Sequence, residues 1–381
     1  MLVVLVIFKF CVIFIKVTLP RRKNKARTGK KDGFFKITDF FDMTERFITS
    51  TLNRRDAARE ATLRPPTFAE FPGQDRVKEQ LELFVQAAKA RDEALEHILL
   101  SGPPGLGKTT LAYIIANERG TNIKSSSGPA IEKPGDLAGL LTSLEPGDVL
   151  FIDEIHRLST TVEEYLYSAM EDFFIDIMLE QGAGARSVRL SVPRFTLIGA
   201  TTRQGMISAP LRARFGLNIR LDYYDAGPLC SILRRSAGIL GVEIEPEGAE
   251  VIASRCRGTP RIANNLLRRA RDYAQIRADS VITGKVAEDA LAMLQIDTDG
   301  LDEMDLRILD VIISNFRGGP VGLKNIAVSV GEEEDAIEDV YEPFLIQRGY
   351  LTRTSKGRVA TDKAWRKLGI KRTLGGTGDL F

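Results

Sequence analysis

Residues 102–109 read GPPGLGKT, which is a complete GxxxxGK[ST] phosphate-binding motif. An apolar run, HILL at 97–100, predicts a strand before it, and the residues from Thr109 onward predict a helix after it. Glycines let consecutive backbone N–H groups turn toward one phosphate, and a helix N-terminus adds a positive field there. We therefore expect Lys108 to reach the β- and γ-phosphates of a nucleotide, Thr109 to bind Mg²⁺ and Thr110 to lie near the α- and β-phosphates. The competing interpretation is a glycine-rich turn without a ligand.

A second motif, VLFIDE at residues 149–154, is an apolar strand that ends in two carboxylates. Side chains at the carboxyl end of a parallel strand face the ligand crevice. We expect Asp153 to hold the Mg²⁺ shell and Glu154 to polarise the attacking water, the alternative being a solvated strand end. His156 follows them, and we interpret it as a packing or hydrogen-bonding residue, because Glu154 already fills the role of a base.

Short apolar runs at 97–100, 149–152 and 195–198 show no polar alternation. Such runs are typical of strands buried on both faces, which predicts an α/β domain with a parallel sheet flanked by helices. Residues 226–296 carry apolar residues at helical spacing and predict a small all-helical domain.

The last part of the chain changes pattern again. Helices are predicted at 303–316, 323–330 and 334–347, followed by a strand–turn–strand around residues 354–357. Three helices and a hairpin of this size predict a winged helix. The expected domains are therefore an extension (1–42), a large ATPase domain (43–223), a small helical domain (224–296), which we call the lid, and a C-terminal winged helix (297–381).

The amino-acid composition says less about function than the motifs do. The 381 residues are 44% hydrophobic and 27% charged, enough for two or three domains with real cores. The net charge of +2 does not indicate a nucleic-acid binder, so any DNA contact must come from a local patch. Three scattered cysteines and two histidines argue against a disulfide framework or zinc site and favour a reducing, cytosolic compartment.

The N-terminal segment points to a different location from the cytosol. Residues 1–19 are apolar except for Lys9, Lys16 and Thr18, and a basic stretch follows, as in a membrane anchor or signal-like segment. The two lysines weaken the spanning interpretation. The alternative is that translation starts at Met43 and that residues 1–42 are a start-site artefact.

Two further segments suggest contacts with other molecules. Alternating apolar residues at 174–178 and 188–192 flank a glycine-rich turn and predict a projecting β-hairpin, or a hairpin packed on its own core. Residues 348–372 hold nine basic residues and one acid, whereas residues 332–342 hold seven acids and no base. Because DNA would repel that acidic helix, we infer that the wing contacts DNA, unless the basic segment is only a solvated face.

The order of all these motifs resembles the RuvB family of AAA+ ATPases over residues 63–370. Besides the two ATP motifs, the resemblance rests on IGATTR (198–203), LRARFG (211–216), GTPRIAN (258–264), GGPVGL (318–323) and DVYEP (339–343). It implies that Thr202 senses the γ-phosphate, that Arg214 is an arginine finger acting on the neighbouring subunit's nucleotide, and that Arg261 is the lid's sensor arginine. The nucleotide contacts it implies are Leu63, Arg64, Gly105, Gly107, Lys108, Thr109, Thr110, Glu171, Asp172, Phe173, Arg214, Tyr224 and Arg261.

The resemblance also implies an activity and its partners. Members use ATP and Mg²⁺ to pump duplex DNA through a ring, a hexamer, and so drive branch migration of Holliday junctions in recombination and repair. It implies wing contacts to DNA from Arg353, Arg358 and Lys356, docking of RuvA on exposed Ile175 and Ile177 of the hairpin, and cooperation with the RuvC resolvase in the cytoplasm, with no membrane partner. A clamp-loader-like ATP switch and a membrane-tethered ATP-binding scaffold are the alternatives, and the intact catalytic set argues against the scaffold.

Overall fold

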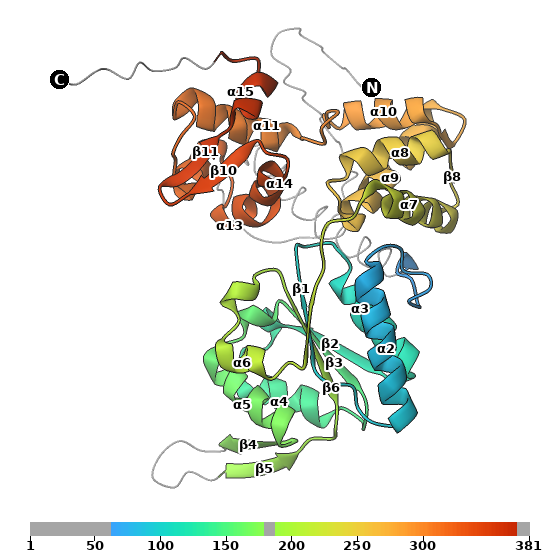
Figure 1. Cartoon of the computed structure of the whole chain (residues 1–381), viewed down its shortest axis with the longest axis vertical. Helices are drawn as coiled ribbons and strands as arrows, with labels where there is room; N and C mark the ends of the chain where they lie inside the picture. The colour runs from blue at the N-terminus through green and yellow to red at the C-terminus, as the bar shows by residue number, and fades with distance from the viewer. Residues whose placement is uncertain (1–61, 179–186, 372–381) are drawn as a thin grey trace, which may run out of the picture. The chain divides into compact units, whose positions relative to one another are not determined.

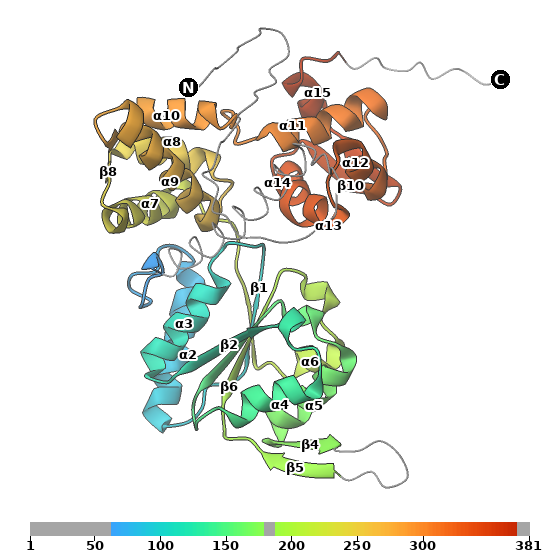
Figure 2. The ribbon, with the colours of Figure 1, turned by 180° about the vertical axis from the view of Figure 1, so that it is seen from behind.

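The structure, a computed structural model, describes residues 62–178 and 187–371 and is shown from opposite sides in Figures 1 and 2. The expected extension, residues 1–42, and the alternative start at Met43 lie outside the described residues. Within the described ranges, no helix is both long and apolar enough to cross a membrane.

A five-stranded parallel sheet forms the centre of the large domain, in the order β2-β3-β6-β1-β7, which confirms the predicted α/β architecture. The strands are β1 (Ile98–Ser101), β2 (Ile123–Ser127), β3 (Val149–Asp153), β6 (Thr196–Thr201) and β7 (Leu217–Arg220). Neighbouring residues of a strand point to opposite faces. Leu99 accordingly joins one apolar cluster, whereas Ile98 and Leu100 join another, and all three are fully buried.

Helices cover both faces of this sheet (Figures 1 and 2). On one face lie α2 (Asp75–Arg91) and α3 (Lys108–Arg119); on the other lie α4 (Pro134–Thr142), α5 (Thr160–Glu171) and α6 (Ala209–Ala213). Short 3₁₀ turns lie between a strand and the helix after it on the second face: η1 (Gly128–Ala130) before α4, η2 (Ile155–Arg157) before α5 and η3 (Gln204–Met206) before α6.

The strand order brings the predicted motifs to one edge. Because β3, β6 and β1 are neighbours and parallel, the segments that follow them emerge side by side. These segments are the carboxylate pair after β3, Thr202 after β6, and the phosphate motif after β1. The backbone N–H of Gly102 donates to the carbonyl of Thr201 at 3.2 Å, which ties two of the segments together.

The lid is built from α7 (Ala226–Leu240), α8 (Pro246–Arg255), α9 (Pro260–Arg277) and α10 (Gly284–Met293). The sequence predicted an all-helical domain, but the lid also contains two short parallel strands, β8 (Glu243–Ile244) and β9 (Val281–Ile282). Each strand has only two residues, too few to produce a detectable strand pattern in the sequence.

The C-terminal domain has the predicted winged-helix elements around its own apolar core. Its helices are α11 (Glu303–Asp310), η4 (Val311–Asn315), α12 (Leu323–Val330), α13 (Glu334–Ala336), η5 (Ile337–Tyr341), α14 (Glu342–Gln347) and α15 (Asp362–Lys367), where η4 and η5 are π-helical. The wing is the antiparallel hairpin of β10 (Leu351–Thr354) and β11 (Gly357–Ala360).

The other predicted hairpin exists, but the prediction that Ile175 is exposed is wrong. Strands β4 (Phe174–Met178) and β5 (Ser187–Ser191) pair antiparallel. Ile175 is only 1% exposed and packs into the domain's own core, and Ile177 is partly buried against the same cluster. Val188, which pairs with Ile177, is the exposed apolar residue of this face.

Candidate functional site

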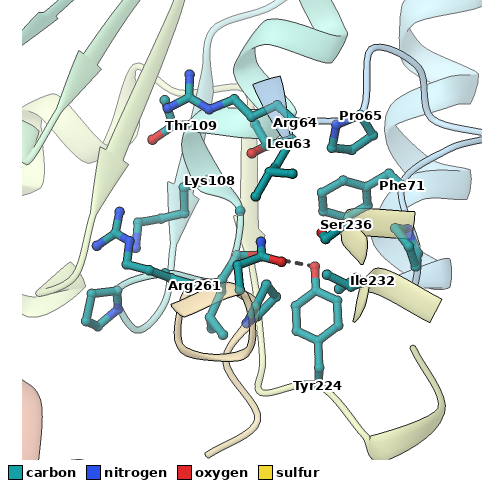
Figure 3. Close-up of a pocket in the computed structure, with 18 of the residues that line it drawn as sticks. Leu63, Arg64, Pro65, Phe71, Lys108, Thr109, Tyr224, Ile232, Ser236 and Arg261 are labelled. Atoms are coloured by element: carbon teal, nitrogen blue, oxygen red, sulfur yellow. Dashed lines mark hydrogen bonds between the residues drawn. The ribbon is translucent and has the colours of Figure 1, made fainter. Parts of the chain in front are cut away.

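A pocket lies at the carboxyl ends of β1 and β3, and the first turn of α9 from the lid forms part of its lining (Figure 3). It brings together many residues predicted to bind nucleotide: Leu63, Arg64, Gly105, Gly107, Lys108, Thr109, Thr110, Asp153, Glu154, Tyr224 and Arg261. The remaining predicted residues lie outside its lining: Glu171, Asp172, Phe173, Thr202 and Arg214. Thr202 nevertheless adjoins the pocket, because it hydrogen-bonds to the lining residue Glu154. The predicted set therefore divides into a group in or beside the pocket and a second group formed by Glu171, Asp172, Phe173 and Arg214.

The phosphate loop needs its glycines for two reasons. Gly105 and Gly107 have φ angles of +79° and +101°, which L side chains rarely adopt. A Cβ at Gly105 would also lie 2.8 Å from Thr259 and 2.9 Å from Arg261, so the lid could not approach this closely. Gly107 is the N-cap of α3 and has no side chain, and no side chain caps the helix here. The first N–H groups of α3 are thus available to an anion.

Lys108 is buried at the start of α3. Its Nζ donates hydrogen bonds to the carbonyls of Gly102 at 2.7 Å and Pro103 at 2.9 Å, so main-chain dipoles hold the ammonium group. Burial lowers the pKa of Lys108 to about 8, although the charges of Glu154 and Asp153 partly oppose this. A bound phosphate would restore the lost charge stabilisation.

The two carboxylates at the end of β3 differ in environment. Burial raises the pKa of Asp153, one of whose oxygens accepts the N–H of Glu154 at 3.0 Å. Glu154 has left-handed backbone, with φ of +47°, a strained geometry for a non-glycine residue. Its Oε2 accepts the hydroxyl of Thr202 at 3.1 Å and lies 3.2 Å from Nδ1 of His156. The predicted sensor threonine therefore orients the predicted catalytic glutamate.

His156 takes the packing and hydrogen-bonding place expected of it. Its Nδ1 lies 2.9 Å from the hydroxyl of Thr201, and burial lowers the pKa of the imidazole despite the neighbouring Glu154 carboxylate. A neutral imidazole can share one hydrogen with either neighbour. His156 therefore completes the set of groups around the Glu154 carboxylate.

The other side of the pocket includes apolar side chains. Figure 3 shows Phe71, Ile232 and Tyr224 lying away from the cationic side chains of Lys108 and Arg261. The Tyr224 hydroxyl donates to the Leu106 carbonyl at 3.2 Å, and burial raises the pKa of this phenol. Apolar and aromatic side chains next to a phosphate loop suit a nucleoside base.

Three lid residues of this wall escaped the sequence analysis: Ile232, Arg235 and Ser236 of α7. Arg235 donates to the Leu63 carbonyl at 2.7 Å and pairs with Glu70 at 3.2 Å, which ties the lid to the segment before α2. No local motif marks these positions, since they join the pocket only through tertiary packing.

Arg214 heads the second group, at the C-cap of α6. Its Nη2 pairs with Glu171 at 3.1 Å, its Nη1 donates to the Pro210 carbonyl at 2.9 Å, and its guanidinium carbon lies 4.4 Å from the ring centroid of Tyr167. Glu171 and Asp172 are exposed, and Phe173 has a φ of +57°. These residues form a polar surface separate from the pocket of the same chain.

The wing places its predicted DNA contacts differently. Arg353 and Arg358 face each other across the hairpin, yet the Arg353 side chain is 58% exposed and the Arg358 side chain 10%. Arg358 donates two hydrogen bonds, at 3.0 and 2.7 Å, to the buried carboxylate of Glu342. Lys356 at the turn is exposed. The two arginines predicted to contact DNA therefore differ in environment: Arg358 is buried and paired with Glu342, whereas Arg353 is largely exposed, and their contacts with DNA stay a prediction.

Comparison with known families covers nearly all of the described chain. Residues 63–221 match the Holliday junction DNA helicase RuvB P-loop domain, residues 224–297 match the RuvB AAA lid domain, and residues 298–369 match the RuvB C-terminal winged helix domain.

Individual proteins agree with these matches. The Holliday junction branch migration complex subunit RuvB of Salinibacter ruber is 59% identical over 318 residues, which cover 84% of this chain and 92% of that protein. The protein of the same name from Chlorobium chlorochromatii is 59% identical over 317 residues, covering 83% and 90%. The solved Thermotoga maritima RuvB Holliday junction branch migration motor shares 51% identity with a TM-score of 0.74, covering 81% of this chain and 99% of that one.

Proposed function

Because the chain belongs to the RuvB family of P-loop AAA+ proteins, we propose that it hydrolyses ATP to pump duplex DNA and so drives branch migration of Holliday junctions. The observation that carries the proposal is the pocket itself. Lys108, Thr109, Asp153 and Glu154 converge there beneath Arg261 of the lid.

We propose specific roles for the pocket residues. Lys108 and the N-terminus of α3 bind the β- and γ-phosphates, Arg261 closes on them from the lid, and Glu154 orients the attacking water. The Thr109 hydroxyl and the Asp153 carboxylate line the same pocket, and both offer the oxygen ligands that Mg²⁺ prefers. Phosphate oxygens and water would complete the coordination of the ion. Bound Mg²⁺ would neutralise the charge that develops on the phosphates.

Arg214 completes the site in trans in this proposal. It lies outside the pocket of its own chain, at an exposed surface that it shares with Glu171. An arginine inserted beside a neighbour's γ-phosphate stabilises the transition state, which is worth about 10³–10⁵ in rate. The assembly we propose is a closed ring, a hexamer as implied by the family, with DNA at its centre.

The contacts outside the ring follow from the other surfaces. Exposed Arg353 and Lys356 of the wing bind the DNA backbone without regard to sequence, as a motor that moves along any duplex requires. Exposed Val188, with the partly buried Ile177 beside it, is the apolar part of the hairpin that we propose docks RuvA. RuvC would act on the same junction in the cytoplasm.

A synthetic four-way junction tests the function. Protein starting at Met43 is incubated with the junction and ATP, with and without RuvA, and strand-exchange products are followed. Products that require ATP, increase with RuvA and vanish in Glu154→Gln support the motor. ATP hydrolysis without movement of the junction under any of these conditions would instead support the clamp-loader-like switch.

A further inference from the structure

Beneath the Arg214 surface, a buried carboxylate ties helix α5 to helix α6. Glu163 is 6% exposed, and its Oε2 accepts hydrogen bonds from the Tyr167 hydroxyl at 2.8 Å and the Ser208 hydroxyl at 2.6 Å. Ser208 is the N-cap of α6 and accepts the N–H of Leu211 at 3.3 Å. The same carboxylate therefore fixes the phenol of Tyr167 and the start of the helix that ends at Arg214.

The guanidinium of Arg214 rests on the ring that this network holds. Its central carbon lies 4.4 Å from the Tyr167 centroid, within range of a cation–π contact. Nη1 is held by the Pro210 carbonyl and Nη2 by the half-exposed carboxylate of Glu171. Nε is buried and has no hydrogen-bond partner within the part of the chain that the structure describes. The group is thus oriented from three sides, while the buried Nε–H is left without an acceptor among the described residues.

We propose that Tyr167 is a positioning residue, which holds Arg214 in the orientation needed to engage the nucleotide of the neighbouring subunit. The proposal rests on the trans role of Arg214 under the proposed function. When the neighbour's γ-phosphate arrives, the guanidinium exchanges its contact with Glu171 for the phosphate, while the ring of Tyr167 and the Pro210 carbonyl keep its plane in place. Little side-chain freedom is then lost at the moment of catalysis.

The hydrogen bonds around Tyr167 indicate that it supports Arg214 as a neutral side chain and does not titrate. Burial raises the pKa of Tyr167, and its hydroxyl donates a hydrogen bond to Glu163, so the phenol stays neutral at physiological pH. An ionised Tyr167 would pair with the arginine and compete with phosphate, whereas a neutral ring offers only its face.

The test compares ATP hydrolysis by rings assembled from Tyr167→Leu, Tyr167→Phe and Arg214→Ala, alone and in the Tyr167→Leu/Arg214→Ala double variant. Tyr165→Leu, the same substitution two residues earlier on α5, is the matched control. Loss of the ring face should lower kcat about 10-fold and change KM less than about twofold, because the contact is made through the arginine. Tyr167→Phe keeps the face and should retain most of kcat, as should Tyr165→Leu.

The double variant separates positioning from structural damage. If Tyr167 acts through Arg214, adding Tyr167→Leu to Arg214→Ala lowers kcat no further. A further loss in that background, or an unchanged kcat in Tyr167→Leu alone, overturns the inference while leaving the trans arginine intact. An Arg214→Ala ring with undiminished kcat would instead remove the trans arginine from the proposed function. Melting curves and sedimentation of each variant show whether the fold and ring are preserved, and a Tyr167→Leu chain that melts early or fails to assemble counts against the proposal.

Discussion

The nucleotide pocket and the wing both offer cations to phosphates, but they hold those cations in different ways. In the pocket, the ammonium of Lys108 donates to main-chain carbonyls. In the wing, Arg358 donates to the buried carboxylate of Glu342, and Arg353 pairs with Glu338 at 3.0 Å. A phosphate entering the pocket meets a cation whose hydrogen bonds go to main-chain carbonyls, whereas a phosphate at the wing competes with carboxylates that already bind the arginines directly. The first arrangement favours a firm grip, the second a contact that is readily released.

The largest effect that would sharpen this comparison is expected for Lys108→Ala. Removing the buried cation should lower ATP turnover by more than about 10³-fold, because the charge on the transferred phosphoryl group loses its fixed partner. Steady-state phosphate release measures it. Lys285→Ala, which removes an exposed lysine paired with Asp289 in the lid, should leave turnover unchanged. Equal losses of turnover in the two variants would mean that Lys108 has no specific role in binding the phosphates.

The next effect concerns the folding stability of the wing. Arg358→Ala leaves the buried Glu342 carboxylate without its main partner, and should lower the free energy of unfolding of the winged-helix domain by about 3 kcal/mol. Arg353→Ala, across the hairpin and largely exposed, should cost far less stability but weaken DNA binding. Denaturant titration and DNA binding at fixed salt separate the effect on stability from the effect on DNA affinity. An unaltered DNA affinity in Arg353→Ala would contradict the proposed contact between Arg353 and DNA.

A smaller effect should appear as pH dependence in the pocket. Burial lowers the pKa of Lys108 from its ordinary 10.5 to about 8, so the lysine loses its proton as pH rises through 8. ATP binds the charged form, and its affinity should therefore fall by up to about tenfold between pH 7 and pH 9. Calorimetric titration across this range measures it. A Lys108→Arg variant keeps its charge and should lose the dependence; if it shows the same decline, another group is responsible.

The smallest effect tests the competing carboxylates of the wing. Glu338→Gln removes the partner of exposed Arg353 and should raise affinity for duplex DNA about threefold, with a steeper dependence on salt. Fluorescence anisotropy over a salt series measures both quantities. Glu303→Gln, in the first turn of α11, is a control of equal charge change. If affinity rises equally in both, net charge alone explains the result and the comparison with the pocket fails.

Local patterns predicted the parts of the structure that depend on local physics. The glycines of 102–109 predicted a phosphate loop because a tight turn before a helix needs them, and the unbroken apolar run 149–152 predicted a buried parallel strand. Period-two alternation correctly indicated the hairpin, but such a pattern has two faces and does not say which one packs on the domain. Ile175 was assigned to the wrong side for that reason.

Tertiary packing decided the features that the sequence could not predict. Arg235 reaches the pocket across 172 residues of chain, and nothing near it in sequence marks that contact. Arg358 and Arg353 have the same chemistry and sit on one short hairpin, yet Glu342 draws only Arg358 into the interior. Predicting that difference requires knowing that the acidic helix lies under the wing.

The separation between the pocket and Arg214 has a consequence for symmetry. If the pocket of one subunit receives Arg214 from the next, the two contact surfaces are different patches, so the interface is heterologous. A head-to-tail contact of this kind has no natural end: it closes when the rotation per subunit divides a full turn, and otherwise extends as a helical filament. Small changes in the angle at which the Arg214 surface meets its neighbour would therefore decide between a closed collar and an open spiral around DNA.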